Sequence, residues 1–287
     1  MMSAAHKLKI GAHLSTAGGI WKAPARAADI GANALQIFST SPRGWKFPNI
    51  SDEDASRFKS EARTHSIEPV YFHASYLINL ADAGRTGNLS VKMLIAELSI
   101  AAKLGIRGSV VHLGSFKNGN AGEPDPKVWA TLIANIKDVI AKMPENVFFI
   151  AENAGTRKIA QSLDELARIV KEVNSSRLKV CLDTCHLFSA GYDISNEKGL
   201  DNFLKEFDTK IGLGRLELIH TNDSRDPFAS MRDRHENIGE GTLGKKTFQL
   251  LLNHPKLLQL PFILEVPGFD DEGPDKKNVD MMRGFVR

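Results

Sequence analysis

Seven apolar runs of this chain each end in a side chain that can bind a metal or move a proton. The residues at these ends are His13, His73, His112, Glu152, Asp183, His220 and Glu265. A single polar residue at a strand end is usually a satisfied structural residue. Seven such endings indicate a common cause. If parallel strands end on one edge, all seven side chains would point into one concave site, here called the bowl.

Two further clusters add ligand types to these endings. His186 follows Asp183 by three residues, and Asp233-Arg234-His235 spaces an aspartate and a histidine two apart. An extended backbone turns residues two apart to the same side, so both could chelate one ion. Taken alone, this last cluster fits a solvated loop in a charge-rich stretch as well as it fits a metal site.

The ligand types and their number indicate a site with several metal ions. Imidazole and carboxylate without thiolate favour zinc, manganese or iron. With His13 set aside, nine candidate ligands exceed the needs of one tetrahedral ion and suffice for two or three if a carboxylate bridges. Three divalent ions would leave the bowl with a charge of about +2, which suits a phosphate better than a neutral sugar. Cys181 and Cys185 are interpreted as apolar packing.

The elements that must position these residues are short β-rich runs that alternate with helical patterns. The candidate strands are residues 7–14, 34–39, 69–73, 108–113, 147–152, 178–183, 216–220 and 262–265. They are rich in Val, Ile, Leu and Phe, as in parallel strands buried on both faces. Eight strands in 287 residues favour a (β/α)8 TIM barrel with the metal site at its C-terminal face. A doubly wound sheet normally carries a Gly-rich phosphate loop, and Gly18-Gly19 is too short for one.

Helical patterns fill the intervals between the strands. Ser51 precedes three acidic residues of a first turn, and Ser162-x-x-Glu165 forms a capping box before residues 166–173. Further helices are predicted at 24–30, 89–104 and 126–143, with Gly105 as a C-cap signal. Because no Pro/Gly-rich linker interrupts the pattern, we expect one domain over residues 1–287.

The composition is that of a globular protein, with 42% hydrophobic residues and a net charge of +3. The apolar runs fall short of the roughly 18 residues of a membrane span, and the N-terminus lacks an apolar signal core. We therefore expect a cytoplasmic protein without a membrane partner. The C-x3-C spacing of the two cysteines fits neither a redox motif nor a disulfide framework. The mildly basic charge permits a nucleic-acid partner without arguing for one.

At these residues the chain resembles the endonuclease IV family, the zinc-dependent apurinic/apyrimidinic endonucleases of base-excision DNA repair. The resemblance runs nearly end to end. It rests on GAHLSTAGG (11–19), HASYLINL (73–80), HLGS (112–115), AEN (151–153), CLDTCHLFSAGYD (181–193), HTND (220–223), DRHENIGEG (233–241) and ILE (263–265). The fifth and seventh of these motifs are the most specific.

The resemblance implies three zinc ions and no organic cofactor. The first ion would be held by His73, His112 and Glu152. The second would be held by Glu152, Asp183, His220 and Glu265. The third would be held by His186, Asp233 and His235. Glu152 would thus bridge two ions and help to position the attacking hydroxide, while His13 would stand behind the ligands.

The reaction that the resemblance implies is hydrolysis of the DNA phosphodiester 5′ to an abasic site. It leaves a 3′-hydroxyl and a 5′-deoxyribose phosphate, with a metal-activated hydroxide as nucleophile. Arg43, Tyr76 and Leu77 match positions that enter the duplex in this family, where a wedge can fill the gap left by a missing base. From the residues alone, simple packing of Tyr76 and Leu77 under their loop is favoured. We expect a monomer that acts on double-stranded DNA.

Several positions depart from the family pattern without removing a ligand. Ala74 stands where a polar residue is usual, the segment after Asn153 is short and basic, and Arg225 and Ala229 replace the usual Lys and Gly. These changes bear on the expected DNA contacts.

Two other functions compete with the nuclease hypothesis. A sugar isomerase or epimerase of the xylose-isomerase-like barrels also sets His, Glu and Asp on strand ends, usually around one or two ions. Such an enzyme has little use for His186 with Asp233 and His235. A non-catalytic DNA-binding barrel does not need a bowl of clustered carboxylates.

Overall fold

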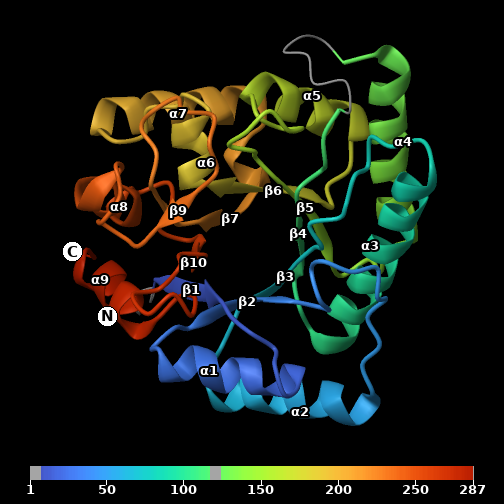
Figure 1. The fold of residues 1–287 in the computed structure, drawn as a ribbon, viewed down its shortest axis with the longest axis horizontal. Helices are drawn as coiled ribbons and strands as arrows, with labels where there is room; N and C mark the ends of the chain where they lie inside the picture. Colours follow the sequence, from blue (N-terminus) through green and yellow to red (C-terminus); the bar gives the residue numbers. More distant parts are fainter. Residues whose placement is uncertain (1–7, 117–123, 287) are drawn as a thin grey trace, which may run out of the picture.

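Parallel strands close into a barrel at the centre of the molecule, and helices surround it (Figure 1). The structure, a computed structural model, describes residues 8–116 and 124–286. Around the barrel the strands follow the order β1, β10, β7, β6, β5, β4, β3, β2, and β2 pairs with β1. Their bounds are Lys9–His13 (β1), Ala34–Phe38 (β2), Val70–His73 (β3), Gly108–Val111 (β4), Phe148–Glu152 (β5), Leu178–Asp183 (β6), Leu216–His220 (β7) and Pro261–Leu264 (β10). The predicted TIM barrel is confirmed.

The strand ends differ slightly from the prediction. β6 and β7 have the predicted bounds, whereas β4 stops at Val111 and β10 at Leu264. The hydrogen-bonded ladder therefore ends before the apolar run does, and His112 and Glu265 lie one residue beyond their strands. Lys7, where the first strand was predicted to begin, lies outside the described residues.

The helices that pack around the barrel follow the strands in sequence. They are α1 (Ala23–Asp29), α2 (Asp52–Thr64), α3 (Arg85–Leu104), α4 (Pro126–Lys142), α5 (Leu163–Val173), α6 (Thr184–Ser189), α7 (Glu197–Lys210), α8 (Gly244–Asn253) and α9 (Lys276–Gly284). Short 3-10 turns occupy η1 (Ile20–Lys22) and η2 (Leu213–Arg215), and a small hairpin joins β8 (Asp223–Ser224) to β9 (His235–Glu236). Within the described residues, no helix is both long and apolar enough to cross a membrane.

Side-chain caps fix where several helices begin and end. The Ser51 hydroxyl accepts the Asp54 amide at 3.0 Å at the start of α2, and Ser162 accepts the Glu165 amide at 3.1 Å at the start of α5. α3 ends at Leu104, and the following Gly105 caps it with a φ of 75°, which favours glycine. Helix α3 begins four residues before the predicted start.

A layer of buried side chains fills the inside of the barrel. Its members are Ala34, Tyr71, Val110, Ile150, Cys181, Leu218 and Ile263. Residues two apart on a strand share a face, so the next inward layer consists of the residues two positions later. That layer is Gln36, His73, His112, Glu152, Asp183, His220 and Glu265. The barrel thus places seven polar side chains on top of an apolar floor.

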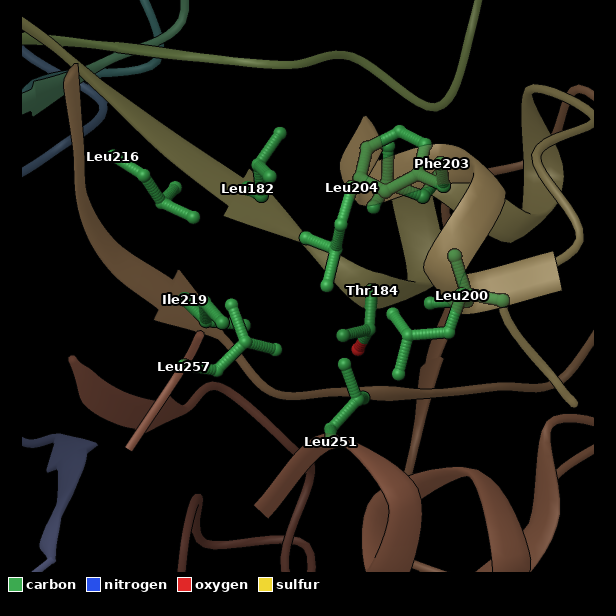
Figure 2. Close-up of a pocket in the computed structure, with 11 residues that line it drawn as sticks. Leu182, Thr184, Leu200, Phe203, Leu204, Leu216, Ile219, Leu251 and Leu257 are labelled. Atoms are coloured by element: carbon green, nitrogen blue, oxygen red, sulfur yellow. The ribbon is translucent and has the colours of Figure 1, made fainter. Parts of the chain in front are cut away.

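A small cavity lies between the barrel and its outer helices. Figure 2 shows Leu182 and Ile219 of the barrel wall facing it together with Leu204 of α7 and Leu251 of α8. Its lining is apolar except for Thr184, whose hydroxyl donates to the Asn222 carbonyl at 2.7 Å. Because such a lining has no free polar group to orient a ligand, we assign this space to core packing.

Candidate metal centre

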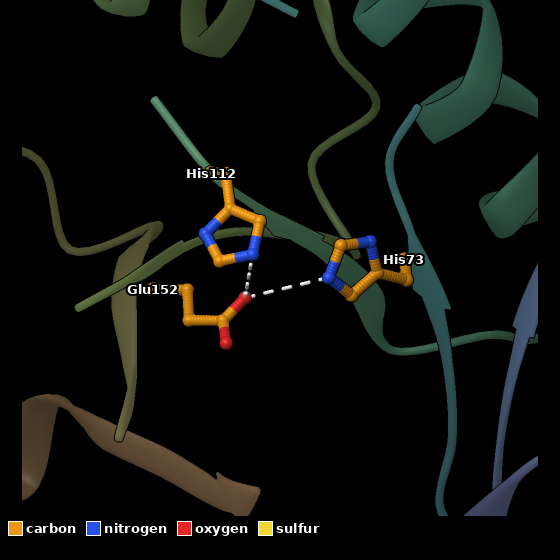
Figure 3. A group of neighbouring side chains, drawn as sticks. All are labelled: His73, His112 and Glu152. Carbon is orange, nitrogen blue, oxygen red and sulfur yellow. Dashed lines mark ion pairs between the residues drawn. The ribbon is translucent and has the colours of Figure 1, made fainter. Parts of the chain in front are cut away.

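The first ligand group joins three neighbouring strands. His73 ends β3, His112 follows β4, and Glu152 ends β5 (Figure 3). Both histidines direct Nε2 at Glu152 Oε2, each at a distance of 3.3 Å. His73 donates its other ring N–H to the Ala74 carbonyl at 2.8 Å, which leaves Nε2 free to face the group. These three residues could hold one ion.

The second ligand group shares Glu152 with the first. His220 Nδ1 lies 3.0 Å from Glu152 Oε1 and 3.1 Å from Glu265 Oε2, and Asp183 Oδ2 lies 3.9 Å from the same nitrogen. The two oxygens of Glu152 therefore face different groups, as a bridging carboxylate would. Burial opposes ionisation of Glu152, but His112 and His220 hold its pKa well below the ordinary range.

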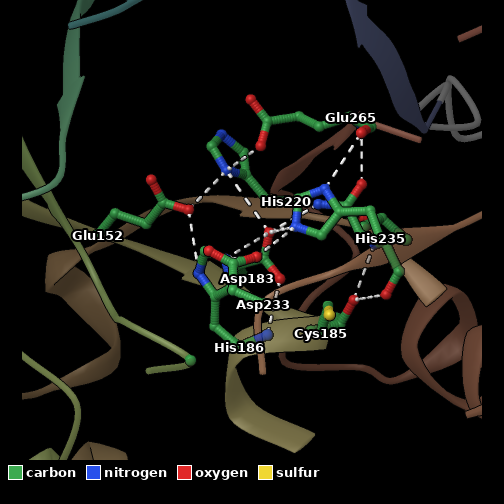
Figure 4. A network of polar contacts seen from close by, with 12 residues as sticks. Glu152, Asp183, Cys185, His186, His220, Asp233, His235 and Glu265 are labelled. Atoms are coloured by element: carbon green, nitrogen blue, oxygen red, sulfur yellow. Dashed lines mark hydrogen bonds and ion pairs between the residues drawn. The ribbon is translucent and has the colours of Figure 1, made fainter. Parts of the chain in front are cut away.

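The third group lies beside the second, toward α6 and the hairpin (Figure 4). Asp233 Oδ1 is 3.0 Å from His186 Nε2 and 3.4 Å from His235 Nε2. Asp183 Oδ2 approaches His235 Nε2 to 3.6 Å, so this carboxylate stands between the second and third groups. Cys185 also lies within reach of Asp233 and His235. Burial raises the pKa of the Cys185 thiol, which disfavours the thiolate.

Local structure places each member of the third group. Asp183 caps α6 by accepting the His186 amide at 2.9 Å, so His186 lies one turn beyond the strand. His186 then donates its Nδ1–H to the Asn153 carbonyl at 2.9 Å. The β8–β9 hairpin brings His235 back over the barrel, where its Nδ1 contacts the Glu265 carbonyl at 3.1 Å.

Burial and neighbouring charge act in opposite directions on these ligands. Burial lowers the pKa of His112 to about 4. Burial also disfavours protonated His186 and His235, but Asp183 and Asp233 outweigh it and raise their pKa to about 10 and about 9. The third group therefore holds protons at neutral pH that a divalent cation would replace.

Three orphaned buried atoms test whether the residues fit metal ions. Glu152 Oε2, His186 Nε2 and His235 Nε2 are buried and have no hydrogen-bond partner among the described residues. Buried polar atoms are rarely left without a partner, and each of these faces other potential ligand atoms. The donors of His73, His112 and Glu152 lie within 4.8 Å of one another, as do those of Glu152, Asp183, His220 and Glu265 and those of Asp183, His186 and His235, and such imidazole and carboxylate sets fit divalent ions.

Two buried asparagines hold the ligands in place, although the sequence pattern does not mark them as functional. Asn222 donates to Asp183 Oδ2 at 2.6 Å and accepts the Glu265 amide at 2.7 Å. Asn153 accepts the Asp183 amide at 2.6 Å. Asn153 directly follows a ligand in the motif AEN and Asn222 follows one by two residues in HTND, which is the signal that could have identified them.

The second strand contributes Gln36, which sequence reasoning also missed. It is the one polar residue of Ala34–Phe38, and that is the available signal. Its side chain contacts His220, Glu265 and His13. His13 Nδ1 lies 3.0 Å from Glu265 Oε1, the oxygen that does not face His220. The His13 side chain also lines the cavity at the site.

The site opens into a cavity of about 420 Å³. Tyr76 stands at its edge with 59% of its surface exposed, and its ring lies 5.9 Å from the His73 ring. Leu77 is half-buried and Arg43 is exposed on the adjoining loop, which the Tyr76 amide joins through the Pro42 carbonyl at 3.1 Å. The exposure of Tyr76 contradicts the interpretation that it packs under its loop.

Comparisons with known proteins place this geometry in context. Residues 24–285 match the family model of xylose isomerase-like TIM barrels. A probable endonuclease 4 from Persephonella marina is 38% identical over 284 residues, which is 98% of each chain. Another from Halothermothrix orenii is 38% identical over 96% of this chain and 99% of its own.

Solved structures give the same result. Endonuclease IV from Thermus thermophilus matches with a TM-score of 0.82 and 30% identity, over 96% of this chain and 98% of that one. A D-tagatose 3-epimerase-like protein has a TM-score of 0.72 but only 17% identity over 97% of each chain, so that likeness concerns the fold alone.

Proposed function

The chain belongs to the endonuclease IV family of xylose isomerase-like TIM barrels, and from this membership we propose that it hydrolyses DNA 5′ to abasic sites. The products would carry a 3′-hydroxyl and a 5′-deoxyribose phosphate. The observation that carries the proposal is the third ligand group, His186 with Asp233 and His235, added to a pair of groups that share Glu152. A barrel that isomerises sugars has little use for that third group.

We propose that the three ligand groups hold three zinc ions. His73, His112 and Glu152 would hold the first. Glu152, Asp183, His220 and Glu265 would hold the second. His186, Asp233 and His235 would hold the third. When bound, these ions supply positive charge for the phosphodiester and acidify water near neutral pH.

The residues of the site contribute position and charge to this reaction. Glu152 stays ionised because the histidines around it lower its pKa, so it can bind cations through both oxygens. Asp183 would contribute one oxygen, Oδ2, which lies between His220 of the second group and His235 of the third. The carboxylates of Asp183 and Glu265 accept the side-chain amides of Asn222 and Gln36, so little reorganisation is needed as charge develops on the substrate.

The rim residues would recognise the DNA. Tyr76 presents an exposed ring next to the ligands, and a planar side chain can fill the space of a missing base. Arg43 lies on the neighbouring loop and would contact phosphate. Such contacts select a lesion and a backbone shape rather than a base sequence.

The test is incubation of the protein with a duplex that carries one abasic analogue, with and without a chelator. We expect a single incision 5′ to the analogue, a 3′-hydroxyl end that a polymerase extends, and loss of incision in the chelator. An intact duplex at high enzyme concentration would reject the proposal, and so would incision that survives complete removal of metal.

A further inference from the structure

Gln36 occupies the position in the ring of strand ends where the other strands carry His, Asp or Glu. It follows Ala34 of the apolar floor by two residues, so it points into the barrel beside the ligands, and it is completely buried. We propose that Gln36 is a positioning residue that fixes His220 and Glu265 toward the second ion. This inference rests on the proposed function, because it takes a metal centre at these residues as its premise.

The amide of Gln36 makes contacts on both sides. Its Oε1 lies 2.9 Å from His220 Nε2 and accepts that N–H. Its Nε2 donates to Glu265 Oε1 at 2.6 Å and lies 3.0 Å from His13 Nδ1. The opposite orientation of the amide would set two oxygens against each other at Glu265 and two donors against each other at His220. The network therefore allows one orientation.

This orientation decides which nitrogen of His220 can bind a metal. With its proton on Nε2 and shared with Gln36, neutral His220 carries a free lone pair on Nδ1. Nδ1 is the atom that faces Glu152 Oε1 and Glu265 Oε2, at 3.0 and 3.1 Å (Figure 4). In the same way, the Gln36 amide donates to Glu265 Oε1, so Glu265 Oε2 remains available to the ligand group.

His220 differs from three of the other ligand histidines, whose partner is a backbone carbonyl. His73, His186 and His235 each place Nδ1 against a backbone carbonyl, at 2.8, 2.9 and 3.1 Å, and present Nε2 to their groups. His220 is turned the other way, so its Nε2 reaches across the barrel to a side chain 184 residues away in sequence. Loss of a partner that orients a metal-binding histidine typically weakens metal affinity on the order of 10–100-fold.

The test is the rate at which zinc leaves the fully loaded protein for a chromogenic chelator. Gln36→Met keeps the volume and removes both polar atoms, while Gln36→Glu keeps an acceptor for His220 but sets a second carboxylate against Glu265. Both should release one zinc of the three faster than the unaltered protein, on the order of 10–100-fold.

The matched control is Tyr71→Phe. Tyr71 pairs in register with Gln36 on the next strand, is equally buried, and donates to Glu217 at 3.0 Å in the apolar floor rather than to a ligand. Zinc release at the unaltered rate from a folded Gln36 variant would overturn the inference, and so would equally fast release from Tyr71→Phe. If Gln36→Met does not fold, the rate of zinc release from Gln36→Glu tests the inference instead. Failure of the proposed function would appear separately, as an unaltered protein that holds no zinc.

Discussion

At the scale of single residues, Glu152 is the centre of the account because its two oxygens face two ligand groups. Oε2 lies 3.3 Å from His73 and His112, and Oε1 lies 3.0 Å from His220. An amide has one acceptor oxygen and no charge, so it cannot serve both groups. The function of this residue therefore depends on ionisation rather than on shape.

Glu152→Gln should abolish incision while the protein stays folded. We expect turnover on an abasic duplex to fall by at least about 10²-fold, and the circular dichroism spectrum to be preserved. Glu97→Gln is the matched control, because Glu97 is a buried carboxylate of α3 bonded to Ser39 and Ser109 and belongs to none of the ligand groups. Unchanged turnover in Glu152→Gln would refute the bridging role.

Tyr76→Ala should weaken binding to an abasic duplex more than binding to an undamaged one. The lost stacking is worth about 1–3 kcal/mol, and only a lesion offers the gap that the ring would fill. Titration of fluorescent duplexes measures both affinities. Leu258→Ala, a similarly exposed apolar residue just before β10 at the opposite end of the barrel, should alter neither. Equal losses on both duplexes would contradict a wedge.

At the scale of elements, the segment after β7 carries Asp233 and His235 of the third ligand group, while α6 carries His186. Asp223 fixes it by accepting the amides of Gly239, Gly241 and Leu243 at 2.9 to 3.1 Å. The β8–β9 pairing then returns Asp233 and His235 to the site. Asp233 and His235 therefore lie outside the barrel strands, on a segment whose position depends on Asp223.

Asp223→Asn should therefore damage the third group selectively. An asparagine supplies one acceptor oxygen and presents donors to the remaining amides, at a cost of roughly 1–3 kcal/mol. We expect the melting temperature to fall and the zinc content to drop from three ions per chain toward two. Retention of three ions at unaltered affinity would contradict the role given to Asp223.

The sequence was most informative where one physical signal dominates. Buried parallel strands read as largely apolar runs, so Leu178–Asp183 and Leu216–His220 were predicted to the residue. The β8–β9 hairpin was not predictable, because two strands of two residues each have no periodicity. The start of α3 was missed because Asp82 accepts the Gly84 and Gly87 amides, a contact that depends on the folded loop.

The same contrast holds for the site. Ligand-type residues at strand ends were visible in sequence, since the strand positions and the residue types are both local. Gln36, Asn153 and Asn222 were not, because their role lies in contacts with residues 30 to 229 positions away.

At the scale of the whole molecule, barrel closure brings distant segments together and concentrates charge. The result is a site whose protonation is linked to folding. Without metal, Asp183 and Asp233 overcome the effect of burial and raise the pKa of His186 to about 10 and of His235 to about 9. These values exceed the ordinary histidine pKa of 6.5, so the folded chain binds these protons more tightly than the unfolded chain.

The chelator-treated protein should therefore lose stability as pH rises. The contribution of these histidines is fully present below pH 6.5 and disappears as pH passes through about 9 to 10. We expect its melting temperature to fall over that range, and zinc to suppress the fall because it replaces the protons. Melting curves from pH 6.5 to 10 check this, and a melting temperature that rises with pH would contradict it.

The central claim is that one barrel mouth holds three metal ions, and the metal content of the purified protein tests it most directly. Elemental analysis of protein dialysed against metal-free buffer, divided by the protein concentration from amino-acid analysis, gives ions per chain. We expect three zinc ions per chain, because the nine ligand-type residues gather in three groups at the mouth of the barrel. One ion per chain or fewer would contradict it.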